Sequence, residues 1–217
     1  MNNVPFTLSQ VRPIRDVMTV SRPSGLGYGV PVTWFSLGAG TSITPEYYDC
    51  TTLYLGGEGN GKFLLGVDGQ EVSVKPGEVL YVPPKTLCGT KTDSGMIYTE
   101  IILKKEHFTM NNIIKAGQPT ELKNLISYEE GSIANLDIAH ADNMKFVLMA
   151  FDEGTGLTPH RAPGNAILTA LEGKAIIGYE GKDYELNAGE SFRFDKNGLH
   201  SVTAQGKFKM SLLLVIE

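Results

Sequence analysis

Short runs of apolar and β-branched residues recur along the whole chain, separated by glycine and proline. One of them, V-T-W-F-S-L at residues 32–37, ends at glycines, and longer runs at residues 96–103 and 208–216 close each half of the chain. The pair Asp68-Gly69 stands between two such runs and indicates a hairpin, because tight hairpin turns need positive φ angles that glycine adopts readily. Short strands joined by glycine-rich turns predict an all-β sandwich or barrel.

One segment of the chain occurs twice. The stretch G-T-S-I-T-P-E that starts at Gly40 reappears as G-T-G-L-T-P-H from Gly154, so that Glu46 stands where the second copy has His160. The hairpin signal is repeated too, as Glu180-Gly181 in the second copy. A segment that recurs together with its downstream turns indicates two structural repeats.

The repeat extends further toward the end of each copy. The turn P-G-E of the first copy matches A-G-E of the second, and counting on equally from the two glycines pairs Cys88 with His200. An agreement of this length predicts two lobes of the same plan. We place them at residues 1–106 and 107–217.

The segments outside the repeats are expected to hold the lobes together. Residues 104–135 contain no Gly/Ser tract, which predicts packed lobes with no flexible tether between them, and Thr120–Ile126 could form a single helical turn. Residues 1–30 are punctuated by proline and glycine, which favours extended segments and turns over a helix. We expect this arm to pack on a barrel face; a lid or a dimer-exchange arm is the alternative.

The spacing within both copies resembles that of the cupins. The first cupin motif is Gly-x5-His-x-His-x3-4-Glu-x6-Gly and the second is Gly-x5-Pro-x-Gly-x2-His-x3-Asn. In the second copy these positions are Gly154, His160, Ala162, Ala166 and Gly173, then Gly189, Asp195, Asn197, His200 and Ala204. In the first copy they are Gly40, Glu46, Tyr48, Thr52 and Gly59, then Gly77, Pro83, Lys85, Cys88 and Thr92. The resemblance implies an all-β chain of two tandem cupin barrels, each a jelly roll or double-stranded β-helix.

The resemblance also implies a residual metal site in the second copy. A metal-binding cupin uses two histidines and a carboxylate from its first motif and one histidine from its second. Here His160 and His200 remain, enough for two ligands of a divalent ion such as Zn, Ni, Fe or Mn, with Asn165 as an extra oxygen donor if its loop is displaced. Two histidines that hydrogen-bond an organic ligand are the alternative. Arg161 is expected to face away from His160, and would suit a carboxylate or phosphate of a ligand if it turned inward.

The first copy keeps less of the motif. Glu46 and Cys88 could both contact a ligand, but a thiolate beside a carboxylate is disfavoured unless a cation holds it. We therefore expect Cys88 to be a small buried residue and the first lobe to hold no metal. His107 and His140 lie outside both repeats and are expected to have structural or surface roles.

Composition limits which classes of binding partner and which cellular compartment we expect. The 217 residues carry a net charge of −5, with a pI near 5.4, which gives no electrostatic reason to expect nucleic acid or an anionic membrane. No run approaches the length of a membrane span, and the N-terminus lacks a signal pattern. Two cysteines are too few for a disulfide framework. We expect a cytoplasmic protein with a small-molecule partner, and leave a homodimer open.

Three functions are compatible with these patterns. The first is a metal-dependent enzyme that acts on a small polar metabolite, as an isomerase, epimerase or dioxygenase. The second is a non-catalytic binding or sensing module, and the third is a structural scaffold. We expect the C-terminal barrel to bind, and in the enzyme case transform, a small polar metabolite beside a metal ion held by His160 and His200.

Overall fold

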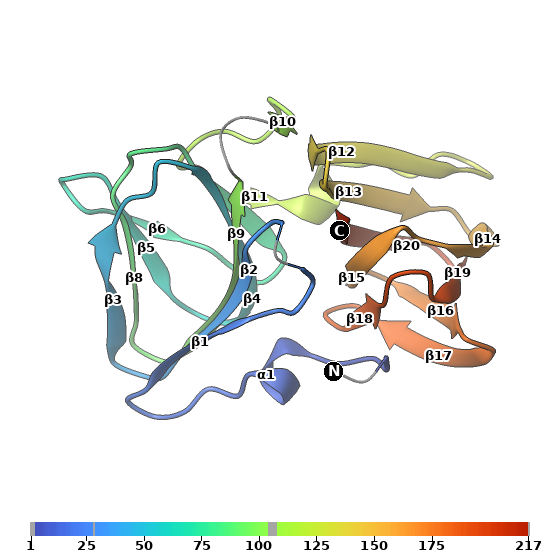
Figure 1. The fold of residues 1–217 in the computed structure, drawn as a ribbon, viewed down its shortest axis with the longest axis horizontal. Coiled ribbons are helices and arrows are strands. Elements are labelled where there is room, and N and C mark those ends of the chain that lie inside the picture. Colours follow the sequence, from blue (N-terminus) through green and yellow to red (C-terminus); the bar gives the residue numbers. More distant parts are fainter. Residues whose placement is uncertain (1–2, 28, 104–107, 217) are drawn as a thin grey trace.

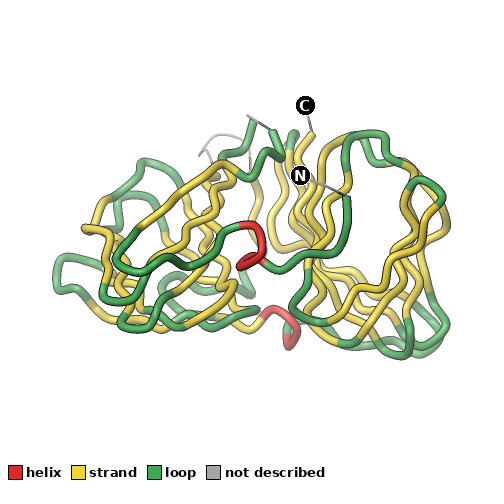
Figure 2. The backbone as a smooth tube through the Cα atoms, turned by 90° about the horizontal axis from the view of Figure 1, so that it is seen from below, coloured by secondary structure: helices red, strands yellow, loops and turns green. Residues whose placement is uncertain are grey.

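Almost all of the regular structure is β. The computed structural model describes residues 3–27, 29–103 and 108–216, and His107 lies outside these ranges. Figure 1 shows two β lobes side by side, with the N-terminal half in blue and green and the C-terminal half in yellow to red. Within the described ranges the helices are α1 (Leu8–Val11) and the 3-10 turn η1 (Leu122–Asn124). Figure 2 shows both between the lobes.

The N-terminal lobe consists of two antiparallel sheets. The larger has the strand order β1 (Thr19–Pro23), β2 (Val32–Leu37), β9 (Met96–Leu103), β4 (Thr51–Gly59), β7 (Glu78–Val82) and β11 (Thr120–Glu121). The smaller has the order β3 (Thr41–Glu46), β8 (Cys88–Thr92), β5 (Lys62–Leu65) and β6 (Gln70–Ser73). Side chains alternate between the two faces of a strand, so one face of each sheet lines the barrel interior.

The C-terminal lobe repeats this plan. Its larger sheet has the order β10 (Phe108–Met110), β12 (Ile133–Ala141), β13 (Met144–Phe151), β20 (Phe208–Ile216), β15 (Gly164–Glu172) and β18 (Ser191–Phe194). Its smaller sheet has the order β14 (Gly156–Arg161), β19 (Leu199–Ala204), β16 (Lys174–Tyr179) and β17 (Lys182–Asn187). The predicted fold, two tandem jelly-roll barrels, is confirmed. The predicted hairpin between β16 and β17 turns at Glu180 and Gly181, which both have positive φ.

The two large sheets pack against each other through an apolar core that belongs to both lobes. From the N-terminal lobe it includes Leu53 and Ile101, and from the C-terminal lobe Leu148 and Val215, each fully buried. Phe146 is also in this cluster. Burial of this shared face holds the two lobes together, so they are packed and not flexibly tethered.

The connection and the N-terminal arm cross between the lobes. β11 adds to the N-terminal sheet beside β7, whereas β10, earlier in the chain, pairs with β12 of the C-terminal sheet. Phe6 forms a bridge with Ser191 of the C-terminal lobe. The expected helical turn in the connection is confirmed by η1. The division at residues 106 and 107 stays a prediction.

The N-terminal arm contains one turn of helix that the sequence pattern did not predict. Thr7 caps α1, because its hydroxyl accepts the Gln10 N–H while the Gln10 side chain accepts the Thr7 N–H. This reciprocal capping box satisfies backbone donors that a helix start otherwise leaves free. Apart from these four residues the described part of the arm consists of extended segments and turns, as predicted. No helix in the described ranges has the length and apolarity needed to cross a membrane.

Truncation of the shared core should destabilise the whole chain. Leu148 is fully buried in this core, so Leu148→Ala is expected to lower the free energy of unfolding by about 2–5 kcal/mol through lost burial and a residual cavity. Urea unfolding followed by tryptophan fluorescence measures it, since Trp34 lies in the other lobe. The control Val67→Ala, at a position 95% exposed, should change stability by less than about 0.5 kcal/mol. A Trp34 transition left unchanged by Leu148→Ala would contradict the shared core.

Candidate functional site

His160 and His200 are direct neighbours on adjacent strands of the small C-terminal sheet. They are register partners on β14 and β19, and their ring centroids are 4.3 Å apart. The β14 register shifts between Leu157 and His160, where the chain reads Thr158-Pro159. Proline has no N–H to donate to a ladder, so a bulge at this point re-aims the side chain that follows.

Backbone carbonyls fix the tautomer of both imidazoles. The Nδ1 atom of His160 lies 2.8 Å from the Thr158 carbonyl oxygen, and Nδ1 of His200 lies 2.9 Å from that of Gly198. A carbonyl oxygen only accepts, so Nδ1 carries the proton in each ring. In the neutral form each Nε2 therefore keeps a free lone pair, which can bind a metal ion or accept a hydrogen bond.

His200 is the buried member of the pair. It is 7% exposed, whereas His160 is exposed, and its ring stacks on Phe194 at a centroid distance of 4.2 Å. Burial lowers the pKa of His200, the hydrogen bond to Gly198 opposes this, and His160 adds to the lowering. A lowered pKa keeps the imidazole neutral and its Nε2 available to a ligand at neutral pH.

The remaining ligand positions of the motif hold no donor. Ala162 and Ala166 stand where cupins carry a second histidine and a glutamate, and Ala166 is 2% exposed in the barrel core. No group of three or more His, Cys, Asp or Glu side chains arranged to hold a metal occurs in the part of the chain that the structure describes. The protein thus offers two nitrogen ligands, and a bound ion would need oxygens from water or a small molecule to complete its shell.

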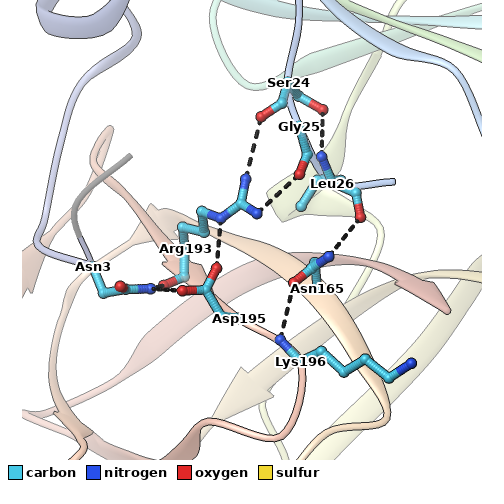
Figure 3. Close-up of polar contacts among 8 residues, drawn as sticks. All are labelled: Asn3, Ser24, Gly25, Leu26, Asn165, Arg193, Asp195 and Lys196. Carbon is cyan, nitrogen blue, oxygen red and sulfur yellow. Dashed lines mark hydrogen bonds and ion pairs between the residues drawn. The ribbon is translucent and has the colours of Figure 1, made fainter. Parts of the chain in front are cut away.

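Arg161 and Asn165 have other partners. The Arg161 guanidinium donates to the Asn197 carbonyl and lies 3.5 Å from Glu180. Asn165 donates from Nδ2 to the Leu26 carbonyl at 3.0 Å, and its Oδ1 accepts the Lys196 N–H at 2.9 Å. Figure 3 shows Asn165 between the N-terminal segment and the C-terminal lobe. The amide nitrogen thus joins the two, while the amide oxygen is engaged within the C-terminal lobe.

Arg193 makes a second contact of the same kind beside Asn165 (Figure 3). Its guanidinium donates to the carbonyls of Ser24 and Gly25 and pairs with Asp195 at 2.9 Å. Asp195, the residue at the proline position of the second motif, also accepts from Asn3. These contacts hold the N-terminal segment against the C-terminal lobe.

The first copy places Glu46 and Cys88 at the positions of the two histidines. They are register partners on β3 and β8, and the β3 register shifts between Ile43 and Glu46, again at a Thr-Pro pair. Cys88 is partly buried, and burial raises the pKa of its thiol to about 11; a hydrogen bond from Tyr54 opposes the rise and Glu100 adds to it. The equivalence of the two pairs is what the repeat alignment predicts.

Glu100 is an ionisable residue of the first barrel that the motif analysis missed. It is 6% exposed on β9, directly opposite Tyr54 of β4. Burial raises the pKa of Glu100 to about 7; a Tyr54 hydrogen bond opposes this, and Glu46 adds to the rise. A signal was present, because Glu100 is the one acidic residue in the apolar run M-I-Y-T-E-I-I-L.

A cavity of about 200 Å³ lies between the two large sheets. Trp34 and Thr99 line it from the N-terminal lobe, and Phe146 and Ser211 from the C-terminal lobe. The repeats gave no indication of it, since it forms only where the two lobes meet. The exposed His140 lies away from it on β12, opposite Lys145.

Comparison with known proteins relates the chain to the cupins. A family model described as a cupin domain matches residues 147–216. The solved structure of a Cupin 2 conserved barrel domain protein from Leptotrichia buccalis has a TM-score of 0.83 and 24% identity, and the match covers 97% of this chain and 95% of that one. A salicylate 1,2-dioxygenase from Pseudoaminobacter salicylatoxidans, described as an adduct with gentisate, has a TM-score of 0.67 and 12% identity, covering 98% and 81%. No curated protein matches the chain.

Burial of Glu100 should make stability depend on pH. Its pKa of about 7 in the folded protein lies above the ordinary 4.5, so the folded state binds this proton more tightly and stability falls as pH rises from about 4.5 to 7. Glu100→Gln removes this dependence and is expected to raise the free energy of unfolding at pH 8 by about 3 kcal/mol, with little change at pH 4.5. Urea titrations at both pH values test it, with the exposed Glu153→Gln as control. Equal effects of Glu100→Gln at the two pH values would contradict the buried ionisation.

The thiol of Cys88 should react slowly. Its raised pKa leaves little thiolate at pH 8, so in a Cys50→Ser background we expect labelling by a disulfide reagent to be at least roughly tenfold slower than after unfolding in urea. Tyr54→Phe removes the hydrogen bond that lowers this pKa and should slow labelling further. Faster labelling in Tyr54→Phe would show that access to the thiol, and not its ionisation, sets the rate.

Proposed function

We propose that this two-domain cupin-fold protein, whose C-terminal lobe matches the cupin domain family, binds a small oxygen-bearing metabolite beside a divalent metal ion at His160 and His200. The single observation that supports this best is the shared tautomer of the pair. Both Nδ1–H groups are engaged by backbone carbonyls, so two imidazole lone pairs on neighbouring strands are left for one ion.

The surrounding residues favour this use of the pair. Thr158 and Gly198 fix the ring orientations through their carbonyls, and Phe194 supports the His200 ring by stacking. The small side chains of Ala162 and Ala166 take little space at the other ligand positions of the motif. When bound, a divalent ion would polarise a coordinated oxygen of the metabolite as a Lewis acid.

The number of protein ligands indicates the chemical class of the metabolite. Two nitrogens leave at least two positions of a tetrahedral shell to be filled, and more of an octahedral one. A molecule with two adjacent oxygen donors, such as a 2-hydroxy or 2-keto acid, fills two positions at once. We propose this class of ligand, with His160 at the exposed side of the site and His200 at the buried side.

A second candidate is a metal-free binding or sensing module. The observation that favours it is that, within the described residues, no third His, Cys, Asp or Glu joins the pair to hold a metal. In that case the two Nε2 atoms accept hydrogen bonds from hydroxyl groups of the same metabolite. A buried acceptor such as His200 discriminates strongly against ligands that lack the matching donor.

Metal content separates the two candidates. After reconstitution with zinc, nickel, iron or manganese and removal of free ion, the native protein should retain bound metal by elemental analysis, and His160→Ala and His200→Ala should each lose most of it, because one imidazole holds a divalent ion far more weakly than two. His140→Ala is the matched control, since this exposed histidine lies on β12 outside the pair. Retention should fall at acid pH, where a protonated imidazole has no lone pair to offer.

Two results would contradict the metal proposal. One is a native protein as empty as both variants after reconstitution with every ion. The other is retention that survives in His160→Ala and His200→Ala but fails in His140→Ala. In the first case, titration of the metal-free protein with a 2-hydroxy acid and its deoxy analogue tests the second candidate, which requires the hydroxy acid to bind more tightly.

A further inference from the structure

The interior of the N-terminal barrel holds a cluster of acidic groups that the proposed function does not use. At its centre are Glu100 on β9 and Tyr54 on β4, which lie opposite each other in register and point to the same side of the large sheet. The Tyr54 hydroxyl lies close to both the Glu100 carboxylate and the Cys88 thiol, and the three groups act on one another's pKa. Because Cys88 belongs to β8 of the small sheet, these three side chains meet between the two sheets of the barrel.

Aromatic rings surround this cluster. Tyr98, two residues before Glu100 on the same face of β9, is 2% exposed and lies 5.8 Å from the Tyr54 ring between centroids. Phe63 of the small sheet lies 4.8 Å from Tyr54 and 5.2 Å from Tyr98. Phe35 stacks on Tyr98 at 4.9 Å. Glu100 therefore lies in a barrel interior rich in aromatic rings.

The groups that face Glu100 carry no compensating positive charge. Those that act on its pKa, or whose own pKa it raises, are Tyr54, Tyr98, Cys88, Glu46 and Tyr48. All five are acids. Within the described ranges, the ion pairs of the molecule do not include Glu100. A buried carboxylate without a cation is costly, so the ionised form of Glu100 has no counter-charge within this barrel.

A second polar group inside the same barrel also lacks a partner. Thr90 on β8 is 3% exposed, and alternation along the strand places its side chain on the same face as Cys88. Its Oγ1 lies near the Tyr98 hydroxyl, whose pKa it lowers, but no group within the described residues meets it with hydrogen-bonding geometry. A buried hydroxyl without a partner is uncommon in native proteins and points to a missing ligand or water.

We propose that the N-terminal barrel is a second ligand site, built around Glu100, Tyr54 and Tyr98, and that it takes a small organic cation. The carboxylate supplies the counter-charge, the tyrosine and phenylalanine rings supply cation–π contacts, and the Thr90 and Tyr98 hydroxyls accept hydrogen bonds from an ammonium group. Tyr48, which is 37% exposed, and the exposed Glu46 mark the side from which a ligand enters.

The same residues argue against a metal ion in this barrel. No set of three or more His, Cys, Asp or Glu side chains in the described part of the chain is close enough to hold one. The thiol of Cys88 is kept protonated by burial, and a metal requires the thiolate. Aromatic faces beside a carboxylate favour a cation with a large, weakly hydrated surface, such as an alkyl- or tetraalkylammonium ion.

Titration of the full-length protein with tetramethylammonium and n-propylammonium chloride tests the proposal. At pH 8 and constant ionic strength, calorimetry should show saturable binding of at least one of them, and no binding of sodium ion or of the neutral analogues tert-butanol and n-propanol. Glu100→Gln should weaken binding at least tenfold. His200→Ala should leave it unchanged, which separates this site from the proposed C-terminal one.

The pH dependence gives a second readout that a purely structural role would not produce. Since the pKa of Glu100 is about 7, its ionised fraction falls between pH 8 and pH 6, and the apparent dissociation constant should rise about tenfold. Tyr54→Phe keeps the carboxylate but removes the hydrogen bond that lowers its pKa, so the midpoint should move to higher pH. This variant gives a second test that keeps the carboxylate in place.

Three outcomes would overturn the proposal. The first is no binding of either ammonium ion to the native protein at pH 8. The second is equal binding of the ammonium ions and their neutral analogues, which would show an apolar pocket indifferent to charge. The third is Glu100-dependent binding of a divalent metal in preference to the organic cations.

Discussion

The structure depends on the apolar contact between the two large sheets. Each barrel turns the outer face of its large sheet toward the other, and the shared core includes Ile101 from one lobe and Leu148 from the other, both fully buried. The polar contacts that cross the same boundary, from Asn165 to Leu26 and from Arg193 to Ser24, then fix the N-terminal segment on the C-terminal lobe. Each barrel also has an apolar cluster of its own, with Phe192 in the C-terminal lobe and Phe63 in the N-terminal lobe fully buried, so burial within the barrels and between them stabilises the fold.

Within each barrel, one irregularity of the backbone positions the chemically active pair. The Thr-Pro bulge occurs in both β3 and β14. In each lobe it directly precedes the first member of the pair, Glu46 on β3 and His160 on β14. The backbone geometry is the same in both lobes, but the side chains differ: they are His160 and His200 in one lobe and Glu46 and Cys88 in the other. The same bulge thus occurs with two different residue pairs, which indicates that the backbone irregularity does not depend on histidine at these positions.

The sequence could predict the features that depend on local spacing. The doubled motif predicted two jelly-roll barrels and aligned Glu46 with His160, because turn residues and strand alternation are properties of short segments. It could not predict the partners of Asn165, which come from Leu26 and Lys196, or the cavity between the sheets, since both arise from contacts between distant parts of the chain. Glu100 was missed for another reason: it lies outside the motifs, and its chemistry comes from burial.

In both barrels, burial favours the neutral form of an ionisable side chain. It lowers the pKa of His200 and raises that of Glu100, so each interior favours the neutral form of a group that water would stabilise when charged. A neutral imidazole retains a lone pair for a metal ion, whereas a neutral carboxyl must lose its proton before it can pair with an organic cation. At neutral pH the C-terminal pair would therefore offer its lone pairs to the proposed ion, whereas Glu100 would have to give up its proton to pair with the proposed cation. The two barrels share one backbone plan, but the same burial leaves an imidazole without its extra proton in one and a carboxyl with its proton in the other.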